Sequence, residues 1–486
     1  MKKILMILIL LVTSIKAQQP ELLWYKLYGG NNEESGRVVR EVSDGYVIFG
    51  HTRSYGAGYA DFYLIKTDKD GVQQWTKTYG GPYDDVCTSG DLASDSGFIL
   101  VGRTDLDGSG NTKILLIRTD NSGNIIWEKI LGSELWNNIN CIKKDYDNGY
   151  IMIGTQMDFR GSLYSRRIII KTDVNGEVLW NSVSSFIGKS GSYINPVLNI
   201  GYIVTGNIKS YGLYQDRYLD LVDLNGNTIW SKGGNGDGEG LTANVLSDSS
   251  YIWSYGNTPY HQPTQYFITK YDKNGGEIFS KLTTRIQAIV ESFDNRILLT
   301  GGIGGANSVG DISILKVDSG GNKIWDTTFS GANYNGNEAA NHVILSSDSS
   351  YVLVGTTTSY QNNWDSKIIL LKYKETGISA VPPEEISLND FKLNQNYPNP
   401  FNPSTKISWQ SPVSGWQTLK IYDVLGNEIA TLVNEFRSAG SYEVEFKSTV
   451  GNRQPAYRTG RLANGVYFYQ LQIGDYVETK KMILLK

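Results

Sequence analysis

The chain has 486 residues, of which 19% are charged and 12% are aromatic, and its formal net charge is −4. This balance gives no electrostatic reason to expect nucleic acid or an anionic membrane as a partner. Abundant glycine and tyrosine, 53 and 32 residues against only 5 methionines, favour an all-β chain of many short strands.

A secretory signal peptide is predicted over residues 1–17. Lys2 and Lys3 precede the apolar run Ile4–Val12, and a basic start with a short apolar core is typical of a removed peptide. The run is too short to span a bilayer, and no later apolar run is long enough. We therefore expect an exported protein with no transmembrane segment in its mature form.

The region 20–377 contains a repeat of about fifty residues, a period that internal repeats of propellers share. One marker is Asp-x-x-Gly followed four residues later by a large aromatic residue, with copies at Asp68, Asp120, Asp173, Asp223, Asp272 and Asp318. A second marker, a large residue that opens an apolar run, occurs seven times, at Tyr46, Phe98, Tyr150, Tyr202, Tyr251, Ile297 and Tyr351. The sequence therefore predicts a seven-bladed β-propeller with four strands in each blade.

Each repeat contains four apolar segments bounded by Gly, Asp, Asn and Ser. In the second complete repeat we expect strands over Asp85–Leu92, Gly97–Arg103, Lys113–Thr119 and Asn124–Lys129. The Asp of the hairpin can bond the backbone locally, and the Gly supplies a positive φ. The strict period of the Trp residues indicates packing between adjacent sheets rather than a row of ligand-binding rings.

The two ends of the repeat array are incomplete in complementary ways. Trp24 has no Asp-x-x-Gly turn before it, and the last repeat stops after Ile368–Lys372 without a Trp. Pairing of these two segments would close the ring and remove two exposed sheet edges. We therefore expect the N-terminal and C-terminal strands of the propeller to pair.

Alternate connections of four-stranded antiparallel blades lie at opposite ends of the propeller. One set is uniformly short, whereas the other is long and variable, with the expected loops Arg53–Asp61, Gln156–Ser165, Lys209–Arg217, Asn257–Gln265 and Thr356–Ser366. Aromatic side chains on such connections suit a glycan or a surface protein as partner, although they could also pack on their own blades. The candidate ligand-binding residues are Tyr55, Tyr59, Phe159, Tyr164, Tyr211, Tyr214, Tyr260, Tyr360 and Trp364.

No catalytic or metal-binding pattern is recognisable, so we expect no cofactor and no metal. His51, His261 and His342 fall in different repeats without metal-ligand spacing. The segment Asp105–Asn111 resembles a calcium loop but lacks a distal Glu, which favours a polar turn. Paired carboxylates of a polysaccharide-active hydrolase or lyase stay open as an alternative, because spatial pairing is invisible in a sequence.

Two cysteines are present, Cys87 and Cys141. A chain of this length can bury a core without covalent cross-links, which favours two buried free thiols. A disulfide stays open for an exported protein, because the two residues fall in matching strands of neighbouring repeats.

The segment 378–390 is predicted to be a linker, and 391–486 a small β-sandwich with strands such as Lys406–Gln410, Thr418–Asp423 and Tyr442–Phe446. Its motifs include Tyr397, Pro398, Asn399, Pro400, Phe401, Asn402, Pro403, Gly426, Gly465, Val466, Tyr467, Lys480 and Lys481. On these residues the segment resembles the type A C-terminal sorting domain of the type IX secretion system. It departs from that family by an insertion over Ser448–Gly460.

The resemblance implies that the type IX secretion machinery recognises this domain. It also implies that the protein is released or held at the outer-membrane surface. Together with the propeller, it predicts a secreted binding or adhesion protein without catalytic activity. The alternative is a secreted polysaccharide-active hydrolase or lyase on the same scaffold.

Overall fold

The computed structural model describes residues 20–132, 136–157, 165–209, 215–234, 238–258, 262–292, 294–303, 310–331, 336–360, 365–375, 391–411, 415–437, 440–448, 462–473 and 476–485. The predicted signal peptide and the predicted linker lie outside these residues. The chain divides into two compact units between residues 378 and 379. In the described part, no helical segment has the length and apolarity that crossing a bilayer would require.

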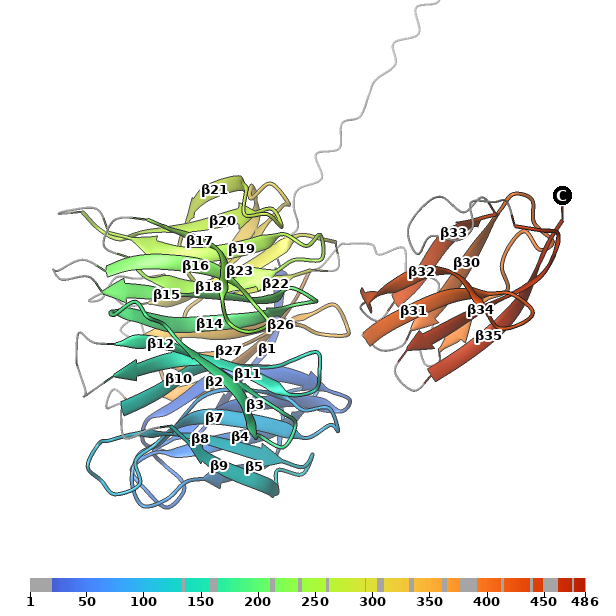
Figure 1. Ribbon diagram of the computed structural model, residues 1–486. Coiled ribbons are helices and arrows are strands. Elements are labelled where there is room, and N and C mark those ends of the chain that lie inside the picture. Colours follow the sequence, from blue (N-terminus) through green and yellow to red (C-terminus); the bar gives the residue numbers. More distant parts are fainter. Residues whose placement is uncertain are drawn as a thin grey trace, which may run out of the picture. The chain divides into compact units, whose positions relative to one another are not determined.

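The first unit is a propeller of seven four-stranded antiparallel sheets, or blades (Figure 1). Blades 1 to 6 take four consecutive strands each, from β2–β5 to β22–β25, and blade 7 has the order β1-β28-β27-β26. In chain order the strands are β1 (Pro20–Tyr28), β2 (Glu34–Val42), β3 (Gly45–Thr52), β4 (Asp61–Asp68), β5 (Gln73–Tyr79), β6 (Asp85–Leu92), β7 (Phe98–Thr104), β8 (Lys113–Thr119), β9 (Ile125–Leu131), β10 (Trp136–Lys144), β11 (Tyr150–Met157), β12 (Arg166–Thr172), β13 (Val178–Val183), β14 (Lys189–Val197), β15 (Gly201–Lys209), β16 (Gln215–Asp223), β17 (Thr228–Gly234), β18 (Gly240–Val245), β19 (Tyr251–Asn257), β20 (Gln265–Tyr271), β21 (Glu277–Thr283), β22 (Arg285–Glu291), β23 (Ile297–Ile303), β24 (Asp311–Val317), β25 (Lys323–Phe329), β26 (Glu338–Leu345), β27 (Tyr351–Thr357) and β28 (Lys367–Glu375).

The predicted pairing of the first and last strands is confirmed. Strand β1 pairs antiparallel with β28, with Trp24 opposite Lys372 and Tyr28 opposite Ile368. Blade 7 also contacts blade 1, because β2 packs against β26 and β27. The Asn341 side chain of β26 donates a hydrogen bond of 2.7 Å to the Gly36 carbonyl of β2. The contacts between neighbouring blades therefore return from the last blade to the first.

Every inner strand contains one irregularity in its pairing with the next strand. Hydrogen bonds from the side chains at these positions reach the adjacent inner strand in several blades; Asn140, for example, donates to the Gly191 carbonyl at 2.6 Å. The blades are therefore joined near the axis by a contact that recurs around the propeller. The irregularities occur at Arg37, Thr88, Asn140, Ser192, Leu241, Gln287 and Asn341.

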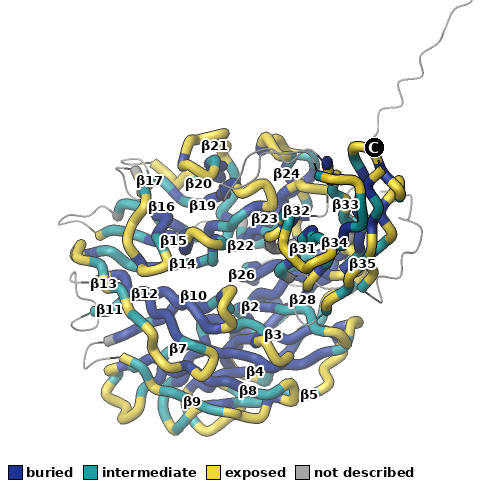
Figure 2. Tube along the Cα trace, turned by 45° about the vertical axis from the view of Figure 1, so that its right-hand side comes forward, coloured by how far each residue is buried: buried dark blue, intermediate teal, exposed yellow. Residues whose placement is uncertain are grey.

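The Asp-x-x-Gly hairpins adopt the predicted turn. In the hairpin at Asp120, one carboxylate oxygen accepts the N–H groups of Ser122 and Asn124, at 2.9 and 2.8 Å. Gly123 has φ +76° and lies against the indole of Trp75 on the preceding blade. The periodic Trp residues therefore pack between blades, as expected. Figure 2 shows buried residues along the inner and middle strands, and exposed ones on outer strands such as β9.

A cation two residues before the hairpin Asp, or before Lys374 at that position in blade 7, pairs with an acid in the turn between the first two strands of the same blade. Blade 4 has Leu221 at the cation position and Asn199 in the turn, so both partners are replaced together. The pairs are Lys66–Asp44, Arg118–Asp95, Lys171–Asp145, Lys270–Asp248, Lys316–Asp294 and Lys372–Asp348.

The second unit is a sandwich of two antiparallel sheets, with the orders β29-β30-β33 and β32-β31-β34-β35. Its core contains Phe401, Trp409 and Tyr469, all almost fully buried. The strands are β29 (Lys392–Leu393), β30 (Ser404–Ser411), β31 (Gly415–Tyr422), β32 (Glu428–Arg437), β33 (Gly440–Lys447), β34 (Gly465–Ile473) and β35 (Tyr476–Leu484).

Candidate functional site

The long connections of the propeller gather at one end, which we call the connection end. In the described part of the chain they include residues 53–60, 105–112 and 184–188, whereas the opposite, hairpin end carries short turns such as 43–44. The expected loop over Lys209–Arg217 is wrong in extent. Strands β15 and β16 remain paired out to Lys209 and Gln215, because their ladder continues past the position where the other blades open.

Three of the nine candidate ligand-binding residues lie in the described part of the chain. Tyr55 packs against Tyr63 with ring centroids 5.8 Å apart, and Tyr360 lies 6.0 Å from Tyr25. Both rings therefore contact their own blades. Tyr59 is 71% exposed. The other six, Phe159, Tyr164, Tyr211, Tyr214, Tyr260 and Trp364, lie outside the described residues.

Exposed apolar residues that the sequence analysis missed also lie at the connection end. Phe186 is 56% exposed and Ile187 is 40% exposed, side by side in the connection 184–188. Leu106, in the connection 105–112, is 53% exposed. The signal in the sequence is an apolar pair within a connection of Ser and Gly residues.

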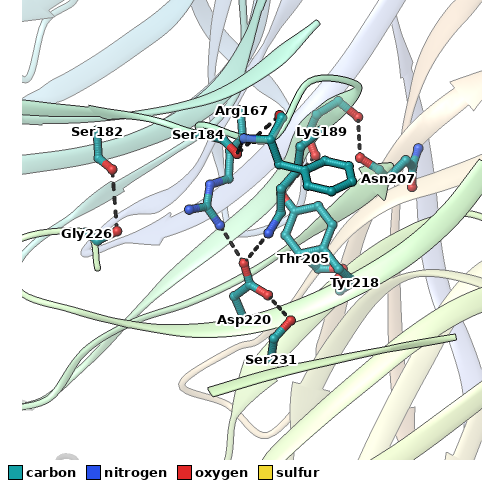
Figure 3. Close-up of polar contacts among 12 residues, drawn as sticks. Arg167, Ser182, Ser184, Lys189, Thr205, Asn207, Tyr218, Asp220, Gly226 and Ser231 are labelled. Carbon is teal, nitrogen blue, oxygen red and sulfur yellow. Dashed lines mark hydrogen bonds and ion pairs between the residues drawn. The ribbon is translucent and has the colours of Figure 1, made fainter. Parts of the chain in front are cut away.

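A charged cluster lies beneath the connection 184–188, at the seam between blades 3 and 4 (Figure 3). Asp220 is fully buried and accepts hydrogen bonds from Arg167 at 2.7 Å and from Lys189 at 2.6 Å. Ser231 donates to its other oxygen at 2.6 Å. Blades 1, 2 and 3 have an isoleucine at the position of Asp220 (Ile65, Ile117 and Ile170). The cluster is therefore a departure from the repeat.

The electrostatics of this cluster favour a supporting role. Lys189 lies 4.0 Å from the centroid of the Tyr218 ring. Burial lowers the pKa of Lys189, and Arg167 adds to this effect while Asp220 opposes it. The backbone of Ser184 donates to the Arg167 carbonyl at 2.9 Å. Since Asp220 is closed from solvent, the cluster holds the connection 184–188 rather than contacting a ligand.

At the connection end, acidic residues at the first position of a strand also accept hydrogen bonds from backbone N–H groups of the preceding connection. Asp61 accepts the N–H of Gly58 at 3.1 Å, and Asp85 accepts that of Gly81 at 2.7 Å. Burial raises the pKa of both carboxyls, against the opposing effect of these hydrogen bonds. These carboxylates are therefore engaged in fixing connections.

The other residues considered for chemistry are buried or committed to local contacts. His51 lies 3.3 Å from the Cys87 carbonyl, and burial lowers its pKa to about 4; His261 lies outside the described residues. Cys87 and Cys141 are buried and not joined to each other. Asp105 accepts backbone N–H groups within its own segment, including that of Gly108 at 2.9 Å. Within the described ranges, no group of three His, Cys, Asp or Glu residues could hold a metal ion.

In the second unit, the proline-rich entry docks on the final strand. Phe401 forms a parallel bridge with Leu484, and the Ile483 N–H donates to the Asn399 side chain at 2.9 Å. Tyr397 is 80% exposed. The remaining motif residues lie on β34, on β35, in the entry itself or in the hairpin of Gly426, whose φ is +83°.

Comparison with known proteins identifies the second unit. Residues 395–485 match the family model described as the secretion system C-terminal sorting domain. A search of curated proteins finds no match.

Solved structures similar to the chain include a puromycin hydrolase (11% identity, 79% of this chain and 59% of that chain, TM-score 0.44). A protein of unknown function from Dyadobacter fermentans (9% identity, 73% and 99%, TM-score 0.42) and a neuraminidase-like protein of flat-faced bat origin (11% identity, 74% and 96%, TM-score 0.39) also match. These likenesses are too weak to bear on activity.

Proposed function

We propose that this chain, which is exported by virtue of the type IX secretion sorting domain at 395–485, is a binding or adhesion protein. Its propeller would hold a glycan or a surface protein through the connection end, either on the cell surface or after release. The observation that carries the proposal is the exposure of Tyr59, Phe186 and Ile187 on connections at this one end. Exposed apolar side chains on a rigid scaffold are typical of binding surfaces.

The contacts beneath these connections support the proposal. Residues 184–188 are fixed at both ends, because Ser184 donates to Arg167 and Gly188 donates to the Ser165 carbonyl at 2.7 Å. A connection held in this way loses little conformational entropy when a partner binds. Buried charge at Asp220 in place of an aliphatic residue is a cost to stability that blade packing does not require. A binding role of the connection 184–188 would explain why this charge is retained.

The test measures binding by the full-length chain to arrays of glycans, polysaccharides and outer-membrane proteins. We expect the Phe186→Ser variant to bind about tenfold more weakly, because an anchoring ring contributes more than 1 kcal/mol. Leu224→Ser is the matched control, since Leu224 is 52% exposed at the hairpin end. Equal binding by both variants and the parent chain would contradict a binding role for the connection end.

The hydrolase or lyase alternative predicts release of sugar products. The same polysaccharides are incubated with the chain, and new reducing ends are measured. Products that disappear in Asp61→Asn or Asp85→Asn would replace the binding proposal with an enzymatic one. Binding without products supports the binding proposal, which agrees with the engagement of both carboxylates by backbone N–H groups.

A further inference from the structure

A pocket of about 280 Å³ opens at the hairpin end of the propeller. Its walls come from the last residues of three inner strands, β10, β14 and β18, and from the turn that follows β10. This is the end opposite the connections of the proposed function. The lining residues are Lys143, Lys144, Tyr146, Asn195, Pro196, Asn244 and Val245.

Positive charge exceeds negative charge next to this pocket. Asp91 on β6 is engaged by the Arg40 side chain at 2.6 Å and by the backbone N–H of Lys144 at 3.0 Å. Lys143 lies 4.9 Å from the centroid of the Tyr193 ring. Near the axis, Asp91 is thus paired with Arg40, whereas Lys143 lies against the Tyr193 ring, and Lys144 adds a further positive charge at the pocket wall.

His342 lies beside the same cations. Arg40 lies 3.0 Å from one ring nitrogen of His342. Burial, followed by the charges of Arg40 and Lys143, holds the pKa of this imidazole well below its usual range. Because a guanidinium can only donate, this ring nitrogen accepts the hydrogen bond from Arg40. The other nearby acids of the turn, Asp145 and Asp147, pair with Lys171 at 2.8 and 2.6 Å.

The remaining walls are rigid and mixed in character. The Asn195 side chain donates to the Ala243 carbonyl at 2.9 Å and to the Asn244 side chain at 2.7 Å. Asn244 in turn donates to the Ile289 carbonyl at 3.0 Å. Pro196 and the half-exposed ring of Tyr146 add apolar surface. The pocket therefore combines two lysines and two amides with the apolar surfaces of Tyr146, Pro196 and Val245.

We propose that this pocket binds a carboxylate-bearing sugar unit of an acidic polysaccharide. The lysines would hold the carboxylate by charge-assisted hydrogen bonds, the amides would contact hydroxyl groups, and Tyr146 and Pro196 would contact the sugar ring. A bare phosphate would leave the Pro196 and Val245 walls uncovered. The site is separate from the connection end and does not depend on the proposed function.

The test is titration calorimetry of the full-length chain with galacturonate oligomers and with neutral galactose oligomers. We expect binding of the acidic oligomers only, weakening as salt rises. Lys144→Gln should weaken it about tenfold, since it removes one charge-assisted contact. Lys69→Gln is the matched control, because Lys69 is exposed in a hairpin at the same end. Phe186→Ser should leave this binding unchanged, which separates the site from the connection end.

Absence of binding, or equal binding of acidic and neutral oligomers, would overturn the proposal. The same holds if Lys69→Gln weakens binding as much as Lys144→Gln does. Inorganic phosphate or a glutamate-rich peptide that competes as well as the galacturonate oligomer would refute the assignment to a sugar. Thermal unfolding of each variant verifies that it is folded, and Tyr146→Ala provides a second variant of the pocket wall, with weaker binding expected.

Discussion

Gly123 of blade 2 lies directly against Trp75 of blade 1. A Cβ atom at position 123 would be 3.0 Å from two atoms of the Trp75 indole. The same relationship joins Gly71 to Trp24 and Gly176 to Trp127. The Gly of each hairpin therefore both permits a positive φ and leaves room for the aromatic residue of the preceding blade.

Gly123→Ala should destabilise the propeller by about 3 kcal/mol. Roughly 1–2 kcal/mol comes from the left-handed backbone, and the rest from crowding against Trp75. Gly426→Ala is the comparison, since Gly426 has φ +83° but a Cβ there would meet no atom within 4 Å. Denaturant unfolding measures the loss of unfolding free energy in each variant. An equal loss in the propeller of Gly123→Ala and in the second unit of Gly426→Ala would contradict the packing role of Gly123.

Acid should destabilise the propeller through its Lys–Asp pairs. Burial raises the pKa of Asp248, but hydrogen bonds from Lys270 and Ser250 outweigh it, so the pKa lies below the ordinary value of 3.8. A depressed folded-state pKa stabilises the fold above the unfolded-state pKa, and this contribution is lost as pH falls through the folded-state value. The Tm should therefore fall below about pH 4. Lys270→Met should reduce this pH dependence, and an unchanged profile would refute the role of the pair.

Thr283→Tyr should stabilise the seam between blades 5 and 6. Thr283 lines a pocket of about 320 Å³, and its hydroxyl has no hydrogen-bond partner in the described structure. At the corresponding position, Tyr79 donates to the Gly123 carbonyl at 2.6 Å. A tyrosine at 283 would fill the space and reach the Gly321 carbonyl, so we expect a gain of about 1 kcal/mol in unfolding free energy.

Thr283→Val is the control for this change. It removes the unpaired hydroxyl without filling the pocket. A gain as large in Thr283→Val as in Thr283→Tyr, measured by thermal unfolding, would show that the hydroxyl rather than the space determines stability at this seam.

Phe401→Ala should unfold the sorting domain and stop export. Phe401 is 2% exposed and contacts the final strand, and loss of a buried Phe costs about 3–5 kcal/mol. Tyr397→Ala should leave the domain folded, because Tyr397 is 80% exposed. Immunoblots of the culture medium and of cell fractions measure export. Normal export of Phe401→Ala would contradict the need for a folded entry segment.

The blade number, the hairpins and the seam contacts could be read from the sequence, because each repeats with the period of the blade. The residues of the Lys–Asp pairs also recur in the repeat. Their pairing could not be predicted without the fold, which places Lys270 and Asp248 on adjacent hairpins of one blade. The candidate site was harder to predict. Tyr55 and Tyr360 are loop residues in sequence, yet both rings pack on neighbouring aromatic side chains.

The sequence by itself determined the C-terminal sorting domain and the architecture of the propeller, because both depend on local patterns that recur or that match a family. Only the tertiary structure brought Arg40, Asp91, Lys143 and His342 together. These residues come from four different blades and meet at the axis, because the inner strands are arranged around it. No local sequence pattern indicates these contacts, because each of them joins residues that are separated by whole blades in the sequence.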